Sequence, residues 1–543
     1  MLVLLFILIL ISIWVGRGVY AVYQQDKHLI EFNDVDWHID LLAKPAYIIR
    51  FFNAVGFGCG PPTAFASVFL FVIDKFLLQP TLLKSLETMK RAEESNAAIP
   101  DILCNEQARI DFEERIRITQ TDIHNSQTMN NISKIFNLAG AYTCLVNHQS
   151  LLQLAIDMDV CRKETVQKPV FIVSLPRTGT TILHRTMALD TQRFRNFDLC
   201  DMIAPLPKPI PRWDIEGRTQ LSIKVTAMFD DLKTIFPGLS ECLETMHGFR
   251  PSEADEDLGW YNTGLGLLFM DSLLKLVPEN RAKPLGMSVL ETKEVAKYRY
   301  AWLALIMKLY QHTDKSEWEQ KKQRSNGGAA EDTSLVSSTK YNKPCPTADL
   351  PWLMKDPNHS AYLNELIEEF PDAKLIFSHR SPGEIIPSMA KLFVCLTSVE
   401  LIPNSKGTTS QEWGQESILR MNHYCDGMVE FTKSQDPSSA LGLKMMGVKT
   451  RKRKDKKVAA RRVDLYFKNV AQDIPGTISQ IYSEFYPEDP TPSQEALAAF
   501  QAYLEGNERE KRGNQRRSLE DFHLNERDVA FEEYHNVFLG TIP

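Results

Sequence analysis

Residues 171–190, FIVSLPRTGTTILHRTMALD, contain an apolar run, then a loop of small and hydroxylated residues around Gly179, then a second apolar pattern. The first run predicts a buried β-strand. The spacing of apolar residues over positions 182–189 predicts an α-helix that begins directly after the loop. A strand that passes through a short loop into a helix is typical of a parallel α/β fold.

The loop itself, residues 176–181, has the chemistry of an anion-binding site. The N–H groups at the start of the helix have no intrahelical partners and lie at the positive end of the helix dipole. Gly179 lets the backbone approach a ligand closely, and Arg177 offers a charged fork of donors. Three threonine hydroxyls can also donate: Thr178, Thr180 and Thr181. The alternative interpretation is an ordinary turn in which a threonine caps the helix.

Two common nucleotide-binding motifs do not fit this loop. A Walker A loop needs a lysine after its second glycine, whereas Thr180 follows Gly179 and no glycine stands five positions earlier. No GxGxxG motif follows a strand, so a Rossmann dinucleotide site has no support. A standard NTPase is therefore disfavoured.

A second polar element follows another predicted strand. Residues 351–354 and 374–379 read as strands joined by an amphipathic helix, a βαβ unit, and Arg380 stands where the second strand ends. Open α/β sheets bind ligands at this edge. Residues 381–384 have the form of a capping box, but Pro387 predicts either a kinked helix or a later helix start. In both cases we expect Ser388 close to a helix start, facing the same anion as Arg380.

Composition limits the function. The chain has 543 residues, 43% of them hydrophobic, and a formal net charge of −7, so it is globular and has no general attraction to nucleic acid. Its nine cysteines are scattered and contain no CxxC pair, so we expect neither a zinc site nor a dense disulfide framework. We expect no metal and no nucleic-acid partner.

The N-terminus predicts association with a membrane. Residues 1–16 carry no charged side chain before Arg17, which favours a membrane anchor over a cleaved signal peptide because the basic start of a signal is missing. A cleavage site near Ala21 remains the alternative. A second apolar block, residues 55–73, reads equally as a broken second span, an interfacial segment or a buried helix.

These patterns divide the chain into three parts. Residues 1–80 hold the anchor and the second apolar segment, residues 81–167 a helical lead-in, and residues 168–543 the α/β domain. Two polar stretches, residues 313–346 and 441–462, read as surface insertions of little order. For the basic run at 451–457, RKRKDKK, a solvated loop is favoured over a nuclear-localisation or lipid-headgroup role.

Together, LPRTGTT at residues 175–181, the LHR that follows it, and the pair Arg380 and Ser388 resemble the sulfotransferases that use 3′-phosphoadenosine 5′-phosphosulfate (PAPS). The resemblance implies a P-loop-like parallel β-sheet flanked by helices. It also implies that residues 177–181 bind the 5′-phosphosulfate, and that Arg380 and Ser388 bind the 3′-phosphate.

Other segments extend the resemblance. WLMKDPNH at residues 352–359 and RPSEADEDL at residues 250–258 are similar to a lysine-containing strand end and an acidic segment of the same family. Residues 503–524 resemble its closing motif, although histidines and a tyrosine of that motif are replaced. By this resemblance, Arg512 and Gly513 would help to cover the nucleotide.

Sulfuryl transfer needs a base for the acceptor hydroxyl and cations for the departing phosphate. Lys355 and Arg177 are the candidates for stabilising the bridging oxygen. His359 is the preferred base, with Glu253 and Asp255 as rivals. The alternative role of His359 is only to order its loop.

The resemblance thus predicts an enzyme that moves the sulfuryl group of PAPS to a hydroxyl or amine. The alternatives are a membrane-bound PAPS-binding or scaffold protein without activity and, with less support, a P-loop nucleotide kinase. A membrane anchor favours a lipid, sterol or glycan acceptor, and a Golgi or ER location if the chain is eukaryotic. The side of the membrane and the oligomeric state stay open.

Overall fold

The computed structural model describes residues 64–126, 131–203, 208–235, 248, 250–265, 292–327, 343–397, 410–435, 461–506 and 518–540. Three expectations lie outside these residues: the N-terminal anchor at 1–16, the basic run at 451–457, and the nucleotide cover by Arg512 and Gly513. The second insertion, 441–462, lies outside them as well, except for its last two residues.

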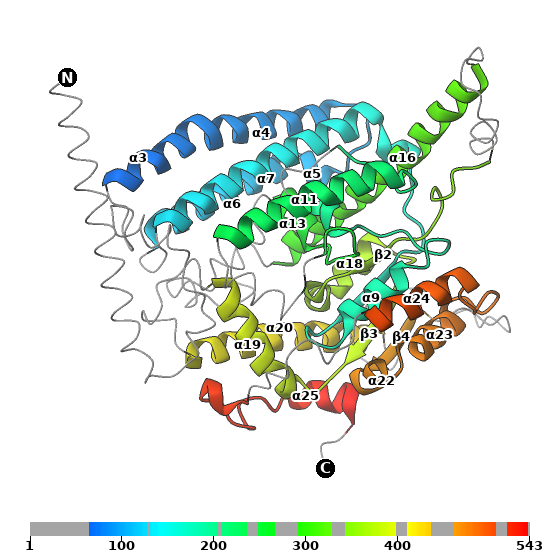
Figure 1. Cartoon of the computed structure of the whole chain (residues 1–543). Helices are drawn as coiled ribbons and strands as arrows, with labels where there is room; N and C mark the ends of the chain where they lie inside the picture. The colour runs from blue at the N-terminus through cyan, green and yellow to red at the C-terminus, as the bar shows by residue number, and fades with distance from the viewer. Residues whose placement is uncertain are drawn as a thin grey trace.

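A four-stranded parallel sheet forms the centre of the α/β domain, in the order β2-β1-β3-β4 (Figure 1). The strands are β1 Val170–Ser174, β2 Leu353–Lys355, β3 Lys374–His379 and β4 Arg462–Tyr466. Val170 pairs with Leu353 on one side and with Lys374 on the other, and Leu375 pairs with Arg462. The fold predicted from the loop and the βαβ unit is confirmed. Arg462, expected at the end of an insertion, instead begins β4.

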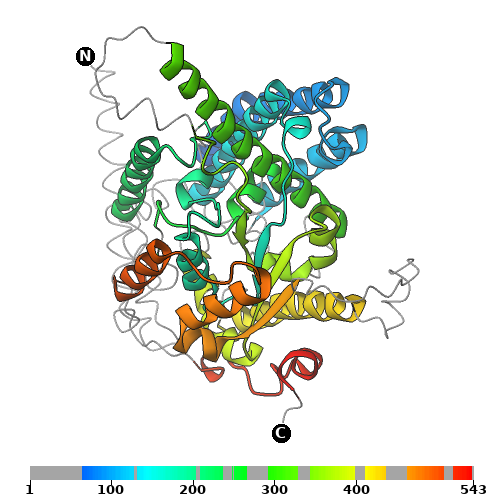
Figure 2. The same cartoon turned by 90° about the vertical axis from the view of Figure 1, so that its right-hand side faces the viewer.

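Helices cover both faces of this sheet, so its inner strands are apolar at successive positions. Phe171 and Val173 pack into a large core on one face, whereas Val170 and Ile172 pack into a smaller core on the other. The first face meets α16, α18 and α20, and the second meets α9, α23 and α24 (Figures 1 and 2). The sheet edge thus remains the place where loops can bind a ligand.

The helices of this domain follow in chain order. They are α9 Thr180–Ala188, α10 Leu199–Met202, α11 Ile215–Ile235, α13 Leu258–Leu265, α16 Lys293–Gly327, the 3₁₀ helix η4 Pro357–Ala361, α18 Leu363–Glu369, α19 Pro382–Thr397, α20 Ser410–Gln435, α22 Phe467–Gln472, α23 Ile474–Phe485, α24 Gln494–Gly506, the 3₁₀ helix η6 Glu520–Phe522, α25 Glu532–Tyr534 and the π-helix η7 His535–Leu539.

Helices run through most of the described part of the expected lead-in, and they share the core of the α/β domain. Its elements are α3 Ala64–Val72, the π-helix η3 Ile73–Leu78, α4 Gln79–Glu94, α5 Asp101–Cys104, α6 Glu106–Asn125, α7 Asn131–Met158 and α8 Val160–Lys163. α7 packs on α4 and also contacts α13 and α16 (Figure 1). Leu145 and Leu152 of α7 belong to the same buried cluster as Trp302 of α16. The lead-in is therefore part of one folded body.

The first expected insertion is partly wrong. Helix α16 continues to Gly327, through fifteen of the residues that were expected to have little order (313–327). Asp314 is buried and pairs with Arg195 at 2.8 Å, and the buried Trp318 ring donates to the carbonyl of Lys343 at 2.9 Å. The buried contacts of the helix are made partly by polar and aromatic residues, so apolar periodicity alone did not reveal them.

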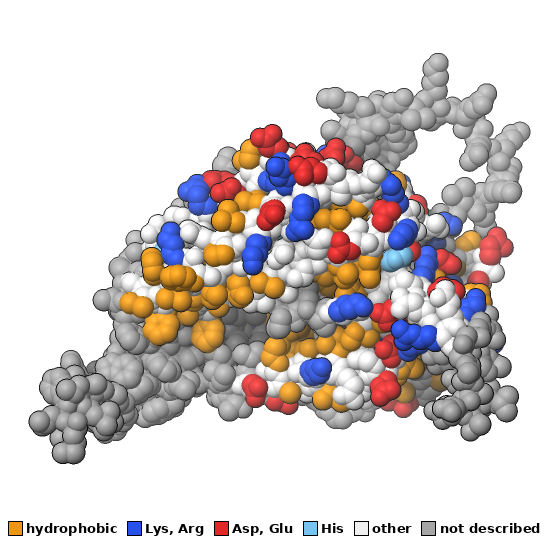
Figure 3. All heavy atoms as spheres, turned by 90° about the horizontal axis from the view of Figure 1, so that it is seen from above, with side chains coloured by type: hydrophobic (Ala, Val, Ile, Leu, Met, Phe, Trp, Pro, Cys, Tyr) orange, Lys and Arg blue, Asp and Glu red, His pale blue; other side chains and the backbone are white. Residues whose placement is uncertain are grey.

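Residues 64–73, the described part of the second apolar block, belong to a long, exposed helix. α3, η3 and α4 follow one another without a break, so the expected boundary at residue 80 falls inside a helix. Ala66–Glu94 is long and apolar enough to cross a membrane, and only 22% of its most apolar stretch is buried. Figure 3 shows hydrophobic side chains gathered on this side of the molecule. Its exposed large hydrophobic residues are Val68, Phe69, Phe71, Val72, Phe76, Leu77 and Leu83. A simple buried core helix does not describe this segment.

Candidate active site

The carboxyl ends of four parallel strands bring the predicted elements to one edge of the sheet. The loop at 175–179 follows β1, Lys355 ends β2, Arg380 follows β3 and Phe467 follows β4. Phe467 carried no signal in the sequence, because its strand is a short edge strand directly after a long polar stretch.

The loop after β1 is a tight turn with two residues in the left-handed region. Arg177 has φ 63° and Gly179 has φ 78°. The hydroxyl of Thr178 donates to the carbonyl of Leu175 at 2.8 Å, and Ser378 donates to the carbonyl of Thr178 at 3.1 Å. Thr178 is fully buried. Its hydroxyl thus shapes the loop and does not face a ligand, contrary to the expectation from the sequence.

The start of α9 is open for an anion. Gly179 is its N-cap residue, and no side chain caps this end. The alternative in which a threonine caps the helix is therefore wrong. A Cβ atom on Gly179 would lie 3.3 Å from the Phe467 ring, so a side chain here would press on that ring as well as strain the backbone. Thr180 and Thr181 are the first two residues of the helix, and Thr180 is buried.

The two predicted elements touch, although they are more than 200 positions apart. Arg177 Nε donates to Ser388 Oγ at 3.0 Å, and Arg380 Nη1 donates to the carbonyl oxygen of Arg177 at 3.0 Å. The guanidinium of Arg380 also lies 4.4 Å from the centre of the Phe467 ring, and its Nε pairs with Glu384. Two arginines and a serine from separate strand-to-helix connections thus form one cluster.

Helix α19 differs in detail from the prediction. It begins at Pro382, and Pro387 lies inside it. A start near Pro387 is therefore wrong, and Ser388 lies in the second turn instead of at the helix start. Pro387 has no N–H group to donate to the carbonyl oxygen of Gly383. The second turn of α19 therefore lacks one backbone hydrogen bond. Ser388 still reaches Arg177 from there.

Lys355 connects this cluster to the acidic segment. Its side chain is only 3% exposed, and Nζ donates to Thr181 Oγ1 at 3.1 Å and to the carboxylate of Glu256. Glu256 retains 24% of its side-chain exposure. The backbone N–H of Asp257 donates to the carbonyl of Lys355, which fixes the acidic segment to the end of β2. A cation and a carboxylate therefore stand together beside the start of α9.

Glu253 and Asp255 pair with a different cation, Arg185. Arg185, the arginine of the LHR motif, pairs with each of these carboxylates at 2.9 Å, and it also donates to the carbonyl of Ala254. Tyr503 donates to Glu253 at 3.3 Å. Arg185 is buried, so these contacts hold the acidic segment in place. Sequence reasoning named Glu253 and Asp255 but missed Glu256, because side-chain direction within the SEADED stretch depends on this anchoring.

His359 lies inside the protein. It has no solvent exposure, its Nε2 lies 3.2 Å from Asp257, and its Nδ1 lies 3.1 Å from the hydroxyl of Tyr261 and 3.3 Å from that of Tyr300. Burial lowers the pKa of His359, but the charge of Asp257 outweighs burial and leaves the pKa raised. In this geometry no atom of the ring is open to an acceptor. The side chain orders the segment after β2.

Asp356 belongs to the same buried group. It has no exposed surface, and its Oδ1 accepts from the backbone and side-chain N–H groups of Asn358 at 2.7 and 2.8 Å. Burial, together with the nearby charges of Asp257 and Glu256, raises the pKa of Asp356 to about 7. Ionisable side chains thus extend from Lys355 into the protein interior, through Asp356 to His359 and Asp257.

The fold and the site first define a class: a P-loop-like α/β protein with an open helix start, two arginines and a lysine–glutamate pair at one sheet edge. Within that class the chain belongs to the sulfotransferase family, whose model matches residues 169–485, more than half of the chain. Family and fold together support sulfuryl transfer as the reaction.

Two solved structures share this fold. Sulfotransferase STF9 from Mycobacterium avium is 17% identical with a TM-score of 0.53, and the match covers 84% of this chain and 96% of that one. Sulfotransferase STF1 from Mycobacterium tuberculosis H37Rv is also 17% identical, with a TM-score of 0.50 and coverage of 84% and 98%. No curated protein matches the sequence.

Proposed function

We propose that this protein transfers the sulfuryl group of PAPS to a hydroxyl or amine acceptor and releases 3′-phosphoadenosine 5′-phosphate (PAP). The observation that carries the proposal is the pair of hydrogen bonds from Arg177 to Ser388 and from Arg380 to the Arg177 carbonyl. They join two elements, each suited to an anion, into one site. A ligand with anionic groups at two separate positions matches such a site better than one with a single phosphate does.

The residues at this edge suit the two anionic groups of the co-substrate. The N–H groups at the start of α9 and the Arg177 guanidinium are suited to the 5′-phosphosulfate, since a helix start without a side-chain cap favours an anion. Arg380 and Ser388 are both half-buried and are suited to the 3′-phosphate. Phe467 holds Gly179 and Arg380 in position by packing against both.

Lys355 and Glu256 would carry out the transfer step. PAPS supplies a sulfuryl group that is activated by its bond to phosphate. In our proposal, the acceptor oxygen bonds to sulfur while Glu256 takes the acceptor proton, and the sulfur–oxygen bond to phosphate breaks. Lys355, next to Thr181, stabilises the negative charge on the departing phosphate.

Glu256 is preferred over the bases expected from the sequence for geometric reasons. Its side chain is partly exposed and forms an ion pair with Lys355, whereas His359 is fully buried. Glu253 also keeps some exposure, with 27% of its side chain accessible, but it is tied to Arg185 and Tyr503. Of these three residues, Glu256 alone combines access with contact to Lys355.

We also propose that the protein works at a membrane and that its acceptor is a lipid, a sterol or a glycan. The support is the exposed apolar helix from α3 to α4 and the uncharged residues 1–16. Aromatic and aliphatic side chains on this helix are suited to the boundary between headgroups and acyl chains. A Golgi or ER location is an expectation for a eukaryotic source alone.

Sulfur-labelled PAPS tests the reaction directly. The full chain is incubated with labelled PAPS and with extracted membrane lipids and glycans, and labelled products are separated. We expect label in an acceptor, and a loss of about 100-fold or more with Lys355→Ala. A chain that binds PAP but labels no acceptor would favour the rival, a PAPS-binding scaffold. Turnover of ATP with Mg²⁺ in place of transfer would favour a kinase.

A further inference from the structure

The last described helical turns of the chain lie against the sheet edge that carries the site. They are α25 Glu532–Tyr534 and η7 His535–Leu539, which follow one another and are together named the C-terminal clasp (Figure 1). Tyr534 and Phe538 of the clasp are buried, and both contact the ends of β3 and β4. The clasp thus joins the end of the chain to the strands that precede Arg380 and Phe467.

His379, the last residue of β3, is held by β4 on one side and by the clasp on the other. Its Nε2 lies 2.8 Å from Oδ1 of Asp464, and its Nδ1 lies 2.8 Å from the hydroxyl of Tyr534. Because the Asp464 carboxylate accepts, Nε2 carries the proton, and Nδ1 accepts from the Tyr534 hydroxyl. Burial lowers the pKa of His379 more than Asp464 raises it, which favours this neutral form. The ring also stacks on Phe538, with ring centres 4.6 Å apart.

The same turns hold the neighbouring strand. Tyr466, the last residue of β4, is the register partner of His379, and its hydroxyl donates to the carbonyl oxygen of Phe538 at 3.2 Å. One more contact lies on the way to α19, where the Ser381 hydroxyl is 3.4 Å from Nε2 of His535. The clasp therefore contacts the last residue pair of the sheet and also the chain that leaves it.

The next residue of each strand belongs to the proposed nucleotide site. Successive side chains of extended backbone point to opposite sides, so Arg380 and Phe467 are directed away from the clasp. They contact each other, with the guanidinium 4.4 Å from the ring centre, and Arg380 also donates to the carbonyl of Arg177. A shift of the pair His379 and Tyr466 would therefore move Arg380 and the ring on which it lies.

We infer that the C-terminal clasp positions Arg380 for the 3′-phosphate, with His379 and Tyr534 as the positioning residues. The inference rests on the proposed function and adds to it the element that holds one side of the nucleotide site. The clasp fixes the strand ends through a hydroxyl and a stacked ring on the side away from Arg380. Nucleotide affinity thus depends on residues that the proposed function does not place against the nucleotide.

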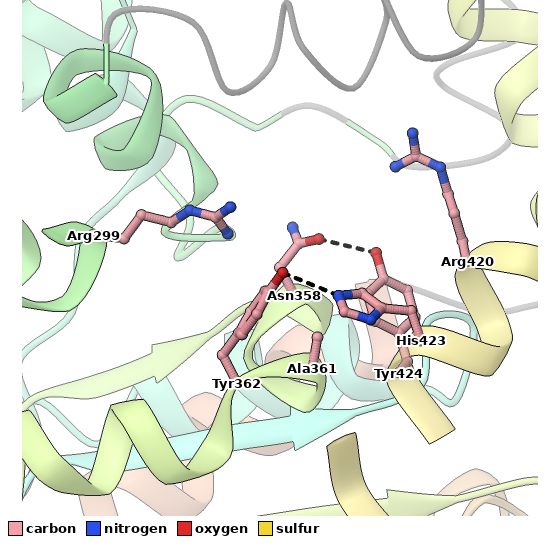
Figure 4. A pocket seen from close by; sticks show the side chains of 7 residues that line it. All are labelled: Arg299, Asn358, Ala361, Tyr362, Arg420, His423 and Tyr424. Carbon is pink, nitrogen blue, oxygen red and sulfur yellow. Dashed lines mark hydrogen bonds between the residues drawn. The ribbon is translucent and has the colours of Figure 1, made fainter. Parts of the chain in front are cut away.

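The affinity of PAP relative to adenosine 5′-phosphate, which lacks the 3′-phosphate, gives the first test. Tyr534→Phe removes the hydroxyl that reaches His379 and keeps the packed ring, so it should reduce the advantage of PAP about fivefold and change adenosine 5′-phosphate affinity less than twofold. Tyr424→Phe is the matched control. It removes a buried hydroxyl that donates to Asn358 at 2.9 Å, after β2 at the same sheet edge, and should keep the advantage (Figure 4).

An unchanged advantage of PAP in Tyr534→Phe, or an equal loss of affinity for both nucleotides, would contradict the inference alone. Absence of PAP binding in the unaltered chain would contradict the proposed function, and the inference with it. Phe538→Ala, which removes the ring stacked on His379, is the second variant and should reduce the advantage of PAP by a larger factor than Tyr534→Phe does.

A double-mutant cycle separates positioning of Arg380 from a general loss of structure. If the clasp acts through Arg380, Tyr534→Phe should lower PAP affinity about fivefold in the unaltered chain but less than twofold in Arg380→Ala. In steady-state transfer, Tyr534→Phe should raise KM for PAPS about fivefold and change kcat less than twofold. An equal loss of PAP affinity in both backgrounds, or a fall in kcat without a rise in KM, would overturn the inference.

Discussion

Glu253 and Glu256 stand three positions apart but contact different cations, and this difference decides their roles. Glu256→Gln should lower kcat by about 100-fold or more, because the proton of the acceptor then has no carboxylate to receive it. PAP affinity should change less than about threefold. The measurements are steady-state transfer from labelled PAPS and equilibrium binding of PAP.

Glu253→Gln is the matched control in the same segment. It removes one partner of Arg185 but leaves Asp255 on that arginine, so we expect activity within about tenfold of the unaltered chain. If Glu253→Gln abolishes transfer and Glu256→Gln does not, the assignment of the base is wrong.

Asp356 gives a test of the buried ionisable group by pH. Burial and the neighbouring carboxylates raise its pKa to about 7 from a usual value of 3.8, so the folded state holds a proton that the unfolded state has released. Between about pH 4 and pH 7 this residue therefore makes the protein less stable as pH rises. Asp356→Asn removes that contribution and still accepts from Asn358.

Urea unfolding at pH 4.5 and pH 7.5 measures this contribution as a difference between two chains. The free energy of unfolding of Asp356→Asn, relative to the unaltered chain, should be higher at pH 7.5 than at pH 4.5 by at least about 1 kcal/mol. Parallel pH dependence in the two chains would show that Asp356 ionises normally in the fold.

At the scale of elements, the helix from α3 to α4 carries the membrane proposal. Phe71→Glu with Phe76→Glu places two charges on its exposed apolar surface, where the phenyl rings are 55% and 66% exposed. We expect a clear loss of binding to phospholipid vesicles, since a charged residue at the centre of a bilayer costs about 2.5–3.5 kcal/mol. Flotation of the chain with and without residues 1–23 separates this helix from the N-terminal segment.

The exposed Ile110 on α6 supplies a control for that experiment. It is 53% exposed, so Ile110→Glu also adds a charge at an exposed apolar position. It lies on another helix and should leave flotation unchanged. Equal binding by all three chains without residues 1–23 would remove α3 and η3 from the membrane account.

Elements differed in how far the sequence could predict them. β1 and β3 are apolar at nearly every position because both faces of the sheet are covered. Their apolar runs therefore predicted two strands, with Arg177 in the loop after the first and Arg380 directly after the second. β4 buries only Val463 and Leu465, alternates with polar residues and follows a long polar stretch, and it was missed together with Phe467. Which carboxylate meets Lys355 depends on buried contacts of Arg185, which no local pattern encodes.

At the scale of the whole molecule, the lead-in helices and the α/β domain share one core around α16. Cys104 and Leu145 of the lead-in lie in the same cluster as Phe171 of β1 and Leu363 of α18. The exposed apolar helix is thus joined rigidly to the sheet whose edge carries the site. This arrangement suits an enzyme that acts on acceptors at a membrane, because the distance from membrane to site is then fixed by the fold.

The central claim is that Arg177, Arg380 and Ser388 form one site for two phosphates, and a binding cycle tests it most directly. PAP and adenosine 5′-phosphate, which lacks the 3′-phosphate, are titrated by calorimetry into the unaltered chain and into Arg380→Ala. We predict that PAP binds at least tenfold more tightly than adenosine 5′-phosphate, and that Arg380→Ala removes this advantage but leaves adenosine 5′-phosphate affinity nearly unchanged. Equal affinity for the two nucleotides in the unaltered chain, or a PAP advantage that survives Arg380→Ala, would contradict the account.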